Sequence, residues 1–354
     1  MFAPDLNDFG PRLGIVWTPE GSEKTVIRAG GAVSYVMPQA IFYYDMAFIN
    51  PALAGVASLN AGDVPNQYLI FPNIVSFQTQ LEANPALLPS SVRLSRNVAD
   101  YNRRDTYVDM WNVAGQRQLN SSLAVQAAYV GQRTVKLVSV RPLNLIDPRT
   151  GVRPISTLGQ VNFEENAANI SYHALALSAN QRLWRGLSYD AYFTRSKTLG
   201  YYTPDDTITF TGSGLQDPYN IAGSNGPVEG APGKLFRGVL SYAIPGGPQL
   251  RQRLLRAIVG GWTLRSIIGW RSGLPLNVTT GADYVGTGRS AGQRPDVTGV
   301  DPYGDFSATG LWLNPAAFTV TQSRTFKRYG DLGFDALLGP SAFTMDSVCT
   351  KAFA

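Results

Sequence analysis

The side chains that most often perform catalysis or bind transition metals are nearly absent from this sequence. Its 354 residues include one histidine, His173, and one cysteine, Cys349. With one of each, the chain can assemble neither a histidine-based triad nor a zinc cluster, and it can form no internal disulfide. We therefore predict no enzyme activity and no cofactor. We expect His173 to be an interfacial residue near one end of its strand.

Two short motifs could bind an ion or a phosphate group, but for each we favour an ordinary loop without a bound ligand. The segment GTGRSAG at 286–292 superficially resembles a phosphate-binding loop. No strand-turn-helix pattern surrounds it, however, and its spacing departs from the dinucleotide fingerprint. The pair Asp205 and Asp206 could bind a cation, although a solvated acidic pair in a loop is commoner. Neither motif predicts a metal or nucleotide site.

The composition limits the class of protein. Charged residues make up 16% of the chain and hydrophobic residues 44%, whereas roughly 25% charge is usual in soluble domains. No run of 18 or more apolar residues occurs, so a helical membrane span is not expected. The net charge of +5 is spread along the chain. Because no Lys/Arg run concentrates it, nucleic acid is not expected as a partner.

Segments that alternate apolar and polar residues occur along most of the chain, and the clearest pair lies within 171–197. There Leu175 and Leu177 share one side of a strand, and the alternation resumes after Trp184-Arg185-Gly186. Two such segments joined by a short Gly-containing turn predict a β-hairpin. Breaks in the apolar face at Arg117 and Ser266 are expected to mark bulges or strand ends. About nine strands are predicted in all, at 13–17, 27–35, 111–119, 123–129, 171–180, 187–194, 240–244, 262–270 and 343–349.

The connections between these segments alternate in length along the chain. The long ones are rich in Pro, Gly, Asn and Asp, which is typical of loops. A soluble β-sandwich has no reason for this asymmetry, whereas a transmembrane barrel has tight periplasmic turns and long outer loops. We therefore predict an all-β fold, an antiparallel transmembrane β-barrel in the cell outer membrane, of which these are about nine strands of a larger barrel. The predicted connections are 18–24, 120–122 and 184–186 (short), 246–257 (medium), and 36–105, 136–170, 199–233 and 273–341 (long).

The two sides of the predicted strands differ in character. One side carries aromatic residues that are typical of interfacial girdles, namely Trp17, Trp111, Tyr129, Tyr189, Tyr242, Trp262 and Trp270. The other side carries the candidate lumen-facing residues, namely Gln126, Asp190, Arg237, Arg265 and Arg271. Three arginines in a soluble core would need paired carboxylates. A watery or plug-filled lumen removes that requirement.

Seven segments occur in order and span nearly the whole chain: FGPRLGIVWTPEGSEKTVIRAGGAVSY, YVDMWNVAGQRQLNSSLAVQAAYVGQR, SYHALALSANQRLWRGLSYDAYFTRSKT, QDPYN, GGWTLRSIIGWRSGLPLNV, RPDVTG and LWLNPAAF. Together they resemble the barrel of TonB-dependent outer-membrane receptors. The likeness is greatest to the Oar-like group, which carries an N-terminal carboxypeptidase-regulatory-like domain. The resemblance implies a large antiparallel barrel that binds and imports a bulky solute with energy from the TonB system.

The chain also departs from that family. Such receptors begin with a signal peptide, a regulatory-like domain, a TonB box and a plug, and none of these is recognised in 1–354. We therefore expect 1–354 to be a barrel fragment that reaches the TonB system only through missing N-terminal parts. The expected partners are outer-membrane lipid and a solute of open identity, which loops 36–105 and 273–341 are best placed to contact. Two alternatives remain: a structural or adhesive outer-membrane barrel without transport, and a soluble secreted β-sandwich that acts as a binding module.

Overall fold

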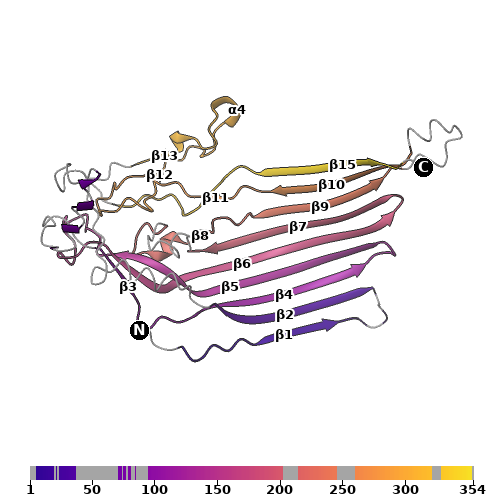
Figure 1. The fold of residues 1–354 in the computed structure, drawn as a ribbon, viewed down its shortest axis with the longest axis horizontal. Coiled ribbons are helices and arrows are strands. Elements are labelled where there is room, and N and C mark those ends of the chain that lie inside the picture. The colour runs from indigo at the N-terminus through magenta and orange to yellow at the C-terminus, as the bar shows by residue number, and fades with distance from the viewer. Residues whose placement is uncertain are drawn as a thin grey trace.

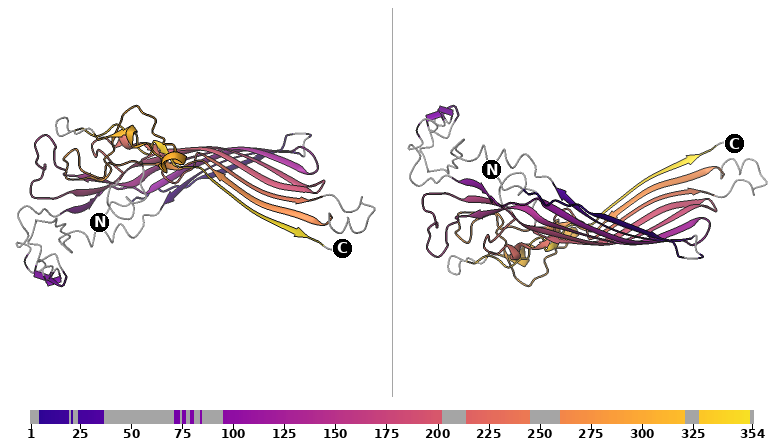
Figure 2. Two further views of the ribbon diagram at one scale, coloured as in Figure 1. Left: turned by 90° about the horizontal axis from the view of Figure 1, so that it is seen from above. Right: turned by 90° about the horizontal axis from the view of Figure 1, so that it is seen from below.

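One continuous antiparallel sheet dominates the structure, a computed structural model (Figure 1). No helix among the described residues has the length and apolar character needed to cross a membrane. The views from above and below show a single layer of long strands that twists and curves (Figure 2). The structure describes residues 5–19, 21, 24–36, 71–73, 75–76, 79–80, 84, 95–201, 214–244, 260–320 and 328–352.

Nine strands form the main path of the sheet, and each pairs antiparallel with the next along that path. This confirms the predicted all-β fold and the number of principal strands. Two short strands join the sheet at its side, since β3 (Arg96–Ala99) pairs parallel with β6 and β8 (Gly226–Pro227) pairs with β7. The path begins at β1 and ends at β15, so the sheet is not closed by the described residues. The nine strands are β1 (Arg12–Trp17), β2 (Thr25–Val36), β4 (Thr106–Gln118), β5 (Leu123–Leu143), β6 (Val161–Trp184), β7 (Leu187–Gly200), β9 (Lys234–Ala243), β10 (Trp262–Arg271) and β15 (Ala342–Lys351).

The short connections lie at one end of the sheet, here called the turn end, and the long ones at the other, the loop end (Figure 1). Between β6 and β7, Arg185 and Gly186 have φ angles of 50° and 86°, as a two-residue type I′ hairpin requires. Between β4 and β5, the Asn120 side chain accepts hydrogen bonds from the amides of Ser122 and Leu123, both at 2.9 Å. Both turns lie where the sequence predicted them. The predicted connection at 246–257 and most of 36–105 lie outside the described residues.

The segment 136–170 was wrongly predicted as a loop. Strand β5 continues to Leu143 and β6 begins at Val161, so the true connection is only 144–160. Register shifts between Thr134 and Ser139 interrupt the alternation, and a bulged strand no longer shows a clean period of two. Nearer the loop end of the same two strands, Arg141 Nη2 and Glu165 Oε2 form an ion pair at 2.7 Å. Such charged residues make this part of the sequence look like a polar loop.

The described parts of 199–233 and 273–341 are more ordered than the loops that the sequence predicted. Their described residues from 214 onwards form a packed unit at the loop end, here called the loop assembly. It is joined to the sheet by a small buried cluster of Ala168, Tyr201 and Leu215. The loop assembly contains η4 (Ile221–Ser224), β8, β11 (Pro275–Leu276) paired with β14 (Leu337–Leu338), β12 (Asp296–Val297) paired with β13 (Phe318–Thr319), α4 (Phe306–Thr309) and η5 (Pro315–Ala317).

The long strands themselves have no second layer over their apolar side among the described residues. Leu175 and Leu177, in the middle of β6, remain 46% and 42% exposed. In a β-sandwich such side chains interdigitate with those of a facing sheet. The described residues therefore do not form a β-sandwich. Their apolar side is open to the surroundings, as in a barrel whose outer face contacts lipid.

Candidate functional site

The pairing register places all five candidate lumen-facing residues on one side of the sheet, here called the polar face. Residues directly opposite each other in an antiparallel pair point to the same side. Asp190 lies opposite Asn180, whose amide donates to its carboxylate, and Arg237 lies opposite Tyr192. Continuing across the strands, Gln126 lies opposite Ser178, Arg265 opposite Ser241 and Arg271 opposite Leu235.

The structure does not bring these five residues into one cluster. They are spread over β5, β7, β9 and β10. In the part of the chain that the structure describes, Arg237, Arg265 and Arg271 form no ion pair. The arrangement therefore resembles a charged lining more than a catalytic centre, and it offers basic side chains to whatever occupies this side of the sheet.

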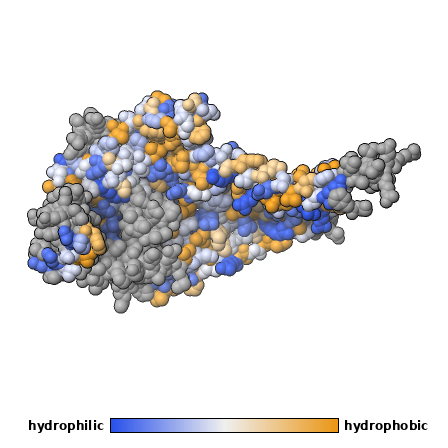
Figure 3. Space-filling view, turned by 45° about the horizontal axis from the view of Figure 1, so that its top comes forward, coloured by the Kyte–Doolittle hydropathy of each residue, from blue (hydrophilic) through white to orange (hydrophobic). Residues whose placement is uncertain are grey.

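The opposite side, here called the apolar face, carries all seven aromatic residues that the sequence assigned to it. Figure 3 shows hydrophobic patches interleaved with hydrophilic ones along the strands on one side of the molecule. Toward the loop end, Trp111, Tyr129 and His173 form an aromatic cluster. The Tyr129 hydroxyl lies 2.7 Å from His173 Nδ1, and the His173 ring centroid lies 6.2 Å from Tyr129 and 6.1 Å from Trp111. His173 was expected near a strand end but lies in mid-strand, because β6 begins earlier than predicted.

A hollow of about 480 Å³ opens on the apolar face between β4 and β9. Small residues form its floor, and a Cβ added at Gly115 would meet no atom within 4 Å. Leu177, Phe193 and Phe236 rise beside this floor. No pattern in the sequence indicated the hollow, because it depends on small residues of four strands lying side by side. Those on the floor are Gly115, Ala127, Ala179 and Ala191.

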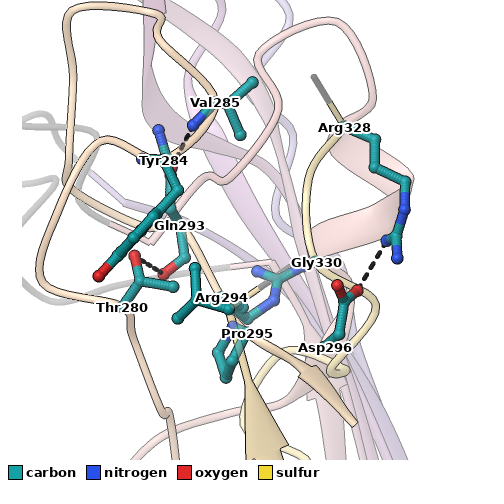
Figure 4. A pocket seen from close by; sticks show the side chains of 10 residues that line it. Thr280, Tyr284, Val285, Gln293, Arg294, Pro295, Asp296, Arg328 and Gly330 are labelled. Atoms are coloured by element: carbon teal, nitrogen blue, oxygen red, sulfur yellow. Dashed lines mark hydrogen bonds and ion pairs between the residues drawn. The ribbon is translucent and has the colours of Figure 1, made fainter. Parts of the chain in front are cut away.

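The loop assembly encloses a second, much smaller cavity of about 20 Å³ (Figure 4). Gln293 and Arg294 line it, and the ion pair of Arg328 with Asp296, at 2.7 Å, closes one side. A space of this size holds about one water molecule. A solute at the loop end would therefore contact the outside of the assembly and not its interior.

Arg294 ties the two long connections together. Its Nε donates to the Leu332 carbonyl at 2.8 Å and its Nη2 to the Gly223 carbonyl at 2.9 Å. The guanidinium also lies 5.8 Å from the Phe334 ring centroid. Burial lowers the pKa of Arg294. Next to it, Asp335 is 3% exposed, and burial, with the charge of Glu229 adding to it, raises the pKa of Asp335 to about 6.

The glycine-rich segment 286–292 wraps around a carboxylate of its own chain. Asp283 accepts hydrogen bonds from the amides of Gly286, Thr287 and Gly288, at 2.9, 3.1 and 2.6 Å. Burial alone would raise the pKa of Asp283, but hydrogen bonds from Gln293 and from these amides outweigh burial and lower it. The amides that a phosphate group would need are therefore already used.

One group of carboxylates could hold a metal ion and was missed by sequence reasoning. Oxygens of Asp5, Asp8 and Asp105 lie within 4.8 Å of one another. Desolvation raises the pKa of Asp8 although the residue is exposed, and a hydrogen bond and repulsion from Asp105 add to the effect. Asp5 also pairs with Arg104 at 3.6 Å and accepts from the Asp105 amide at 3.1 Å. These contacts join the segment before β1 to the start of β4. The other acidic pair, Asp205 and Asp206, lies outside the described residues.

Comparison with known proteins gives a family and distant structural likenesses. A family model described as "Outer membrane beta barrel domain" matches residues 1–354. The FrpB iron transporter of Neisseria meningitidis is 12% identical over 77% of this chain and 28% of its own, with a TM-score of 0.38. The outer membrane transporter YddB of Escherichia coli is 12% identical over 77% of this chain and 30% of its own, with a TM-score of 0.44. The chain thus spans less than a third of either transporter, and no curated protein matches the sequence significantly.

Proposed function

Because this chain belongs to the outer membrane β-barrel domain family, we propose that it forms part of the wall of a TonB-dependent receptor that binds and imports a bulky solute. The observation that carries the proposal is the separation of the sheet into an apolar and a polar face, with the described parts of the long connections at one end. In an outer-membrane barrel the apolar face meets lipid and the polar face lines the lumen. Long loops on such a scaffold are suited to capturing a ligand.

On this proposal, Gln126, Asp190, Arg237, Arg265 and Arg271 line the lumen. The three arginines have no ion-pair partner among the described residues, so they are free to meet acidic groups in the lumen. We favour acidic residues of a plug over the solute as those groups, because a plug would fill the space beside the strands permanently. The plug and the contact with TonB would come from parts of the protein outside 1–354.

The face assignment can be tested with two neighbouring single-cysteine variants. In a Cys349→Ser background, Leu177→Cys lies on the apolar face and Ser178→Cys on the polar face of the same strand. A membrane-impermeant maleimide should label Ser178→Cys in outer-membrane vesicles and leave Leu177→Cys unlabelled until detergent is added. The reverse pattern would refute the assignment of the faces.

The coupling to TonB can be tested without knowing the solute. Outer-membrane vesicles that contain the whole protein should bind the purified periplasmic domain of TonB saturably, and vesicles without the protein should not. Absence of binding would contradict the receptor proposal while leaving the barrel intact.

A second candidate function, adhesion, is favoured by one feature of the loop assembly. Around α4, Phe306 and Leu311 are 61% and 50% exposed, and α4 projects beyond the sheet (Figure 1). Exposed apolar groups at a loop tip suit contact with another protein. If adhesion is the function, Phe306→Ser with Leu311→Ser should reduce attachment between cells and leave the binding of TonB unchanged. Unchanged attachment would remove this candidate.

A further inference from the structure

Four basic side chains lie on the apolar face toward the loop end, and they have no role in the proposed receptor function. They form the basic patch: Arg133, Arg195, Lys197 and Lys234, all exposed. Lys234 lies directly opposite Arg195, so their Cα atoms are about 5 Å apart. Lys197 follows Arg195 on the same side of β7, about 7 Å along the strand. The patch is therefore continuous across β7 and β9, whereas Arg133 lies on β5, with β6 between it and β7.

Among the described residues, the patch has little negative charge near it. Within the described residues none of its four members forms an ion pair. The strand register places one carboxylate, Asp109, beside it, opposite Arg133. Arg195, Lys197 and Lys234 have no carboxylate opposite them in the register, and cations without a counter-ion are costly in hydrocarbon. They become favourable only where an anion from the surroundings meets them.

The aromatic cluster places the basic patch at the level of the lipid headgroups. Lys197 lies opposite His173, and Gly131, beside His173 on β5, is covered by the Trp111 ring. Aromatic girdles in outer-membrane barrels lie at the boundary between hydrocarbon and headgroups. Beyond that boundary, on the loop side, lipid phosphate is the most abundant anion that basic side chains of a membrane protein meet.

The hollow of about 480 Å³ lies next to the patch, on its membrane side. Arg195 and Lys234 are two residues along their strands from Phe193 and Phe236, which line the hollow. The interval between successive residues on one side of a strand is about 7 Å. One molecule with a phosphate head and an acyl chain could therefore occupy both features at once.

We propose that the apolar face binds one phosphorylated lipid of the outer leaflet, with its phosphate on Arg195, Lys197 and Lys234 and an acyl chain in the hollow. The inference rests on the proposed assignment of the apolar face to lipid. It adds a specific lipid site to that assignment. Charge selects the headgroup, and the floor of small residues admits the chain.

The test measures binding of diphosphoryl lipid A to the whole protein in detergent micelles after delipidation, by native mass spectrometry. The triple variant Arg195→Gln, Lys197→Gln, Lys234→Gln should weaken binding about tenfold or more, since each basic residue near the surface contributes to anionic lipid binding. The matched control, Arg237→Gln, Arg265→Gln, Arg271→Gln, removes the same charge from the polar face and should change binding by less than about twofold. Heat-modifiable migration on a gel checks that both variants remain folded.

A second variant tests the hollow without altering charge. Ala179→Phe fills the floor of the hollow and should weaken lipid A binding, whereas Ala176→Phe, on the polar face of the same strand, should not. Wild-type affinity in both the basic-patch triple and Ala179→Phe would overturn the lipid site. If both variants bound lipid A with wild-type affinity while Leu177→Cys remained protected from maleimide, the assignment of the faces would be supported and only the lipid site would be refuted. If instead the polar-face triple lost binding, the proposed function would fall as well.

Discussion

The hydroxyls of Ser266 and Ser347 lie 2.8 Å apart in the middle of β10 and β15, on the apolar face. On the proposed assignment of this face to lipid, each gives the other a hydrogen-bonding partner that lipid chains cannot offer. The register runs through Ser266 without a shift, so the prediction of a bulge or strand end there is wrong. The break at Arg117 does lie near the end of β4, as predicted.

This pair predicts a non-additive effect of mutation. Ser266→Ala removes one partner and leaves the Ser347 hydroxyl unsatisfied, which should lower the free energy of unfolding by about 1 kcal/mol. The double variant Ser266→Ala, Ser347→Ala removes both polar groups and should be close to wild type. The free energies of unfolding of the wild type, the two single variants and the double variant form a double-mutant cycle. They can be measured by urea unfolding in lipid vesicles, followed by tryptophan fluorescence. Additive losses would show that the hydrogen bond is not formed.

The two faces of β6 should respond differently to a charge. Leu177→Arg places a guanidinium in the middle of the apolar band and should cost roughly 2 to 4 kcal/mol of folding free energy. Ser178→Arg, one residue on, points to the polar face and should cost little. The same vesicle unfolding experiment compares them, and equal penalties would contradict the face assignment.

Two glycines on the apolar face provide a test of packing under an aromatic ring. A Cβ on Gly131 would overlap the Trp111 indole, whereas a Cβ on Gly115 would meet open space. We expect Gly131→Ala to cost about 1 to 3 kcal/mol, because the ring must move. Gly115→Ala serves as the control and should be neutral or slightly stabilising in a strand. A neutral Gly131→Ala would mean that Trp111 does not cover this position.

The features that could be predicted from the sequence are those set by neighbours along the chain. The alternation around Leu177 and Phe193, with the turn at Gly186, identifies the hairpin of β6 and β7 and the face of each residue. The full lengths of β5 and β6 could not be predicted from the sequence. They depend on contacts between the strands, such as Arg141 with Glu165, and the bulges interrupt the alternating pattern that would have indicated them. The loop assembly depends on contacts as distant as Arg289 Nη1 to the Leu215 carbonyl, at 2.8 Å.

The basic patch was missed although the sequence carries a signal for it. Arg195 and Lys197 have the same parity as Phe193, so extending the alternation by four residues places two cations on the apolar side. Lys234 could not be added without knowing that β9 pairs with β7 in this register. Parity thus predicts which face a residue occupies, and pairing between strands decides which residues become neighbours.

The loop assembly should lose stability as the pH rises through the titration of Asp335. Burial raises the pKa of this carboxyl to about 6, from the ordinary value of 3.8. Between about pH 4 and pH 6 the folded assembly keeps a proton that the unfolded segment has already released. The free energy of opening therefore falls across this window and stays low above it. Hydrogen exchange of the amides in 328–338, corrected for intrinsic rates, should show stronger protection at pH 5 than at pH 7.5.

Substitution of Asp335 should remove this pH dependence. Its φ of 48° lies in the left-handed region, which Asn tolerates. Asp335→Asn should therefore keep the backbone and raise protection at pH 7.5 by roughly 1 kcal/mol. Asp283→Asn is the contrasting variant. Because hydrogen bonds lower the pKa of Asp283, its carboxylate stabilises the fold above about pH 4, and its loss should reduce protection at pH 7.5. If Asp335→Asn kept the wild-type difference between pH 5 and pH 7.5, another group would have to be its source.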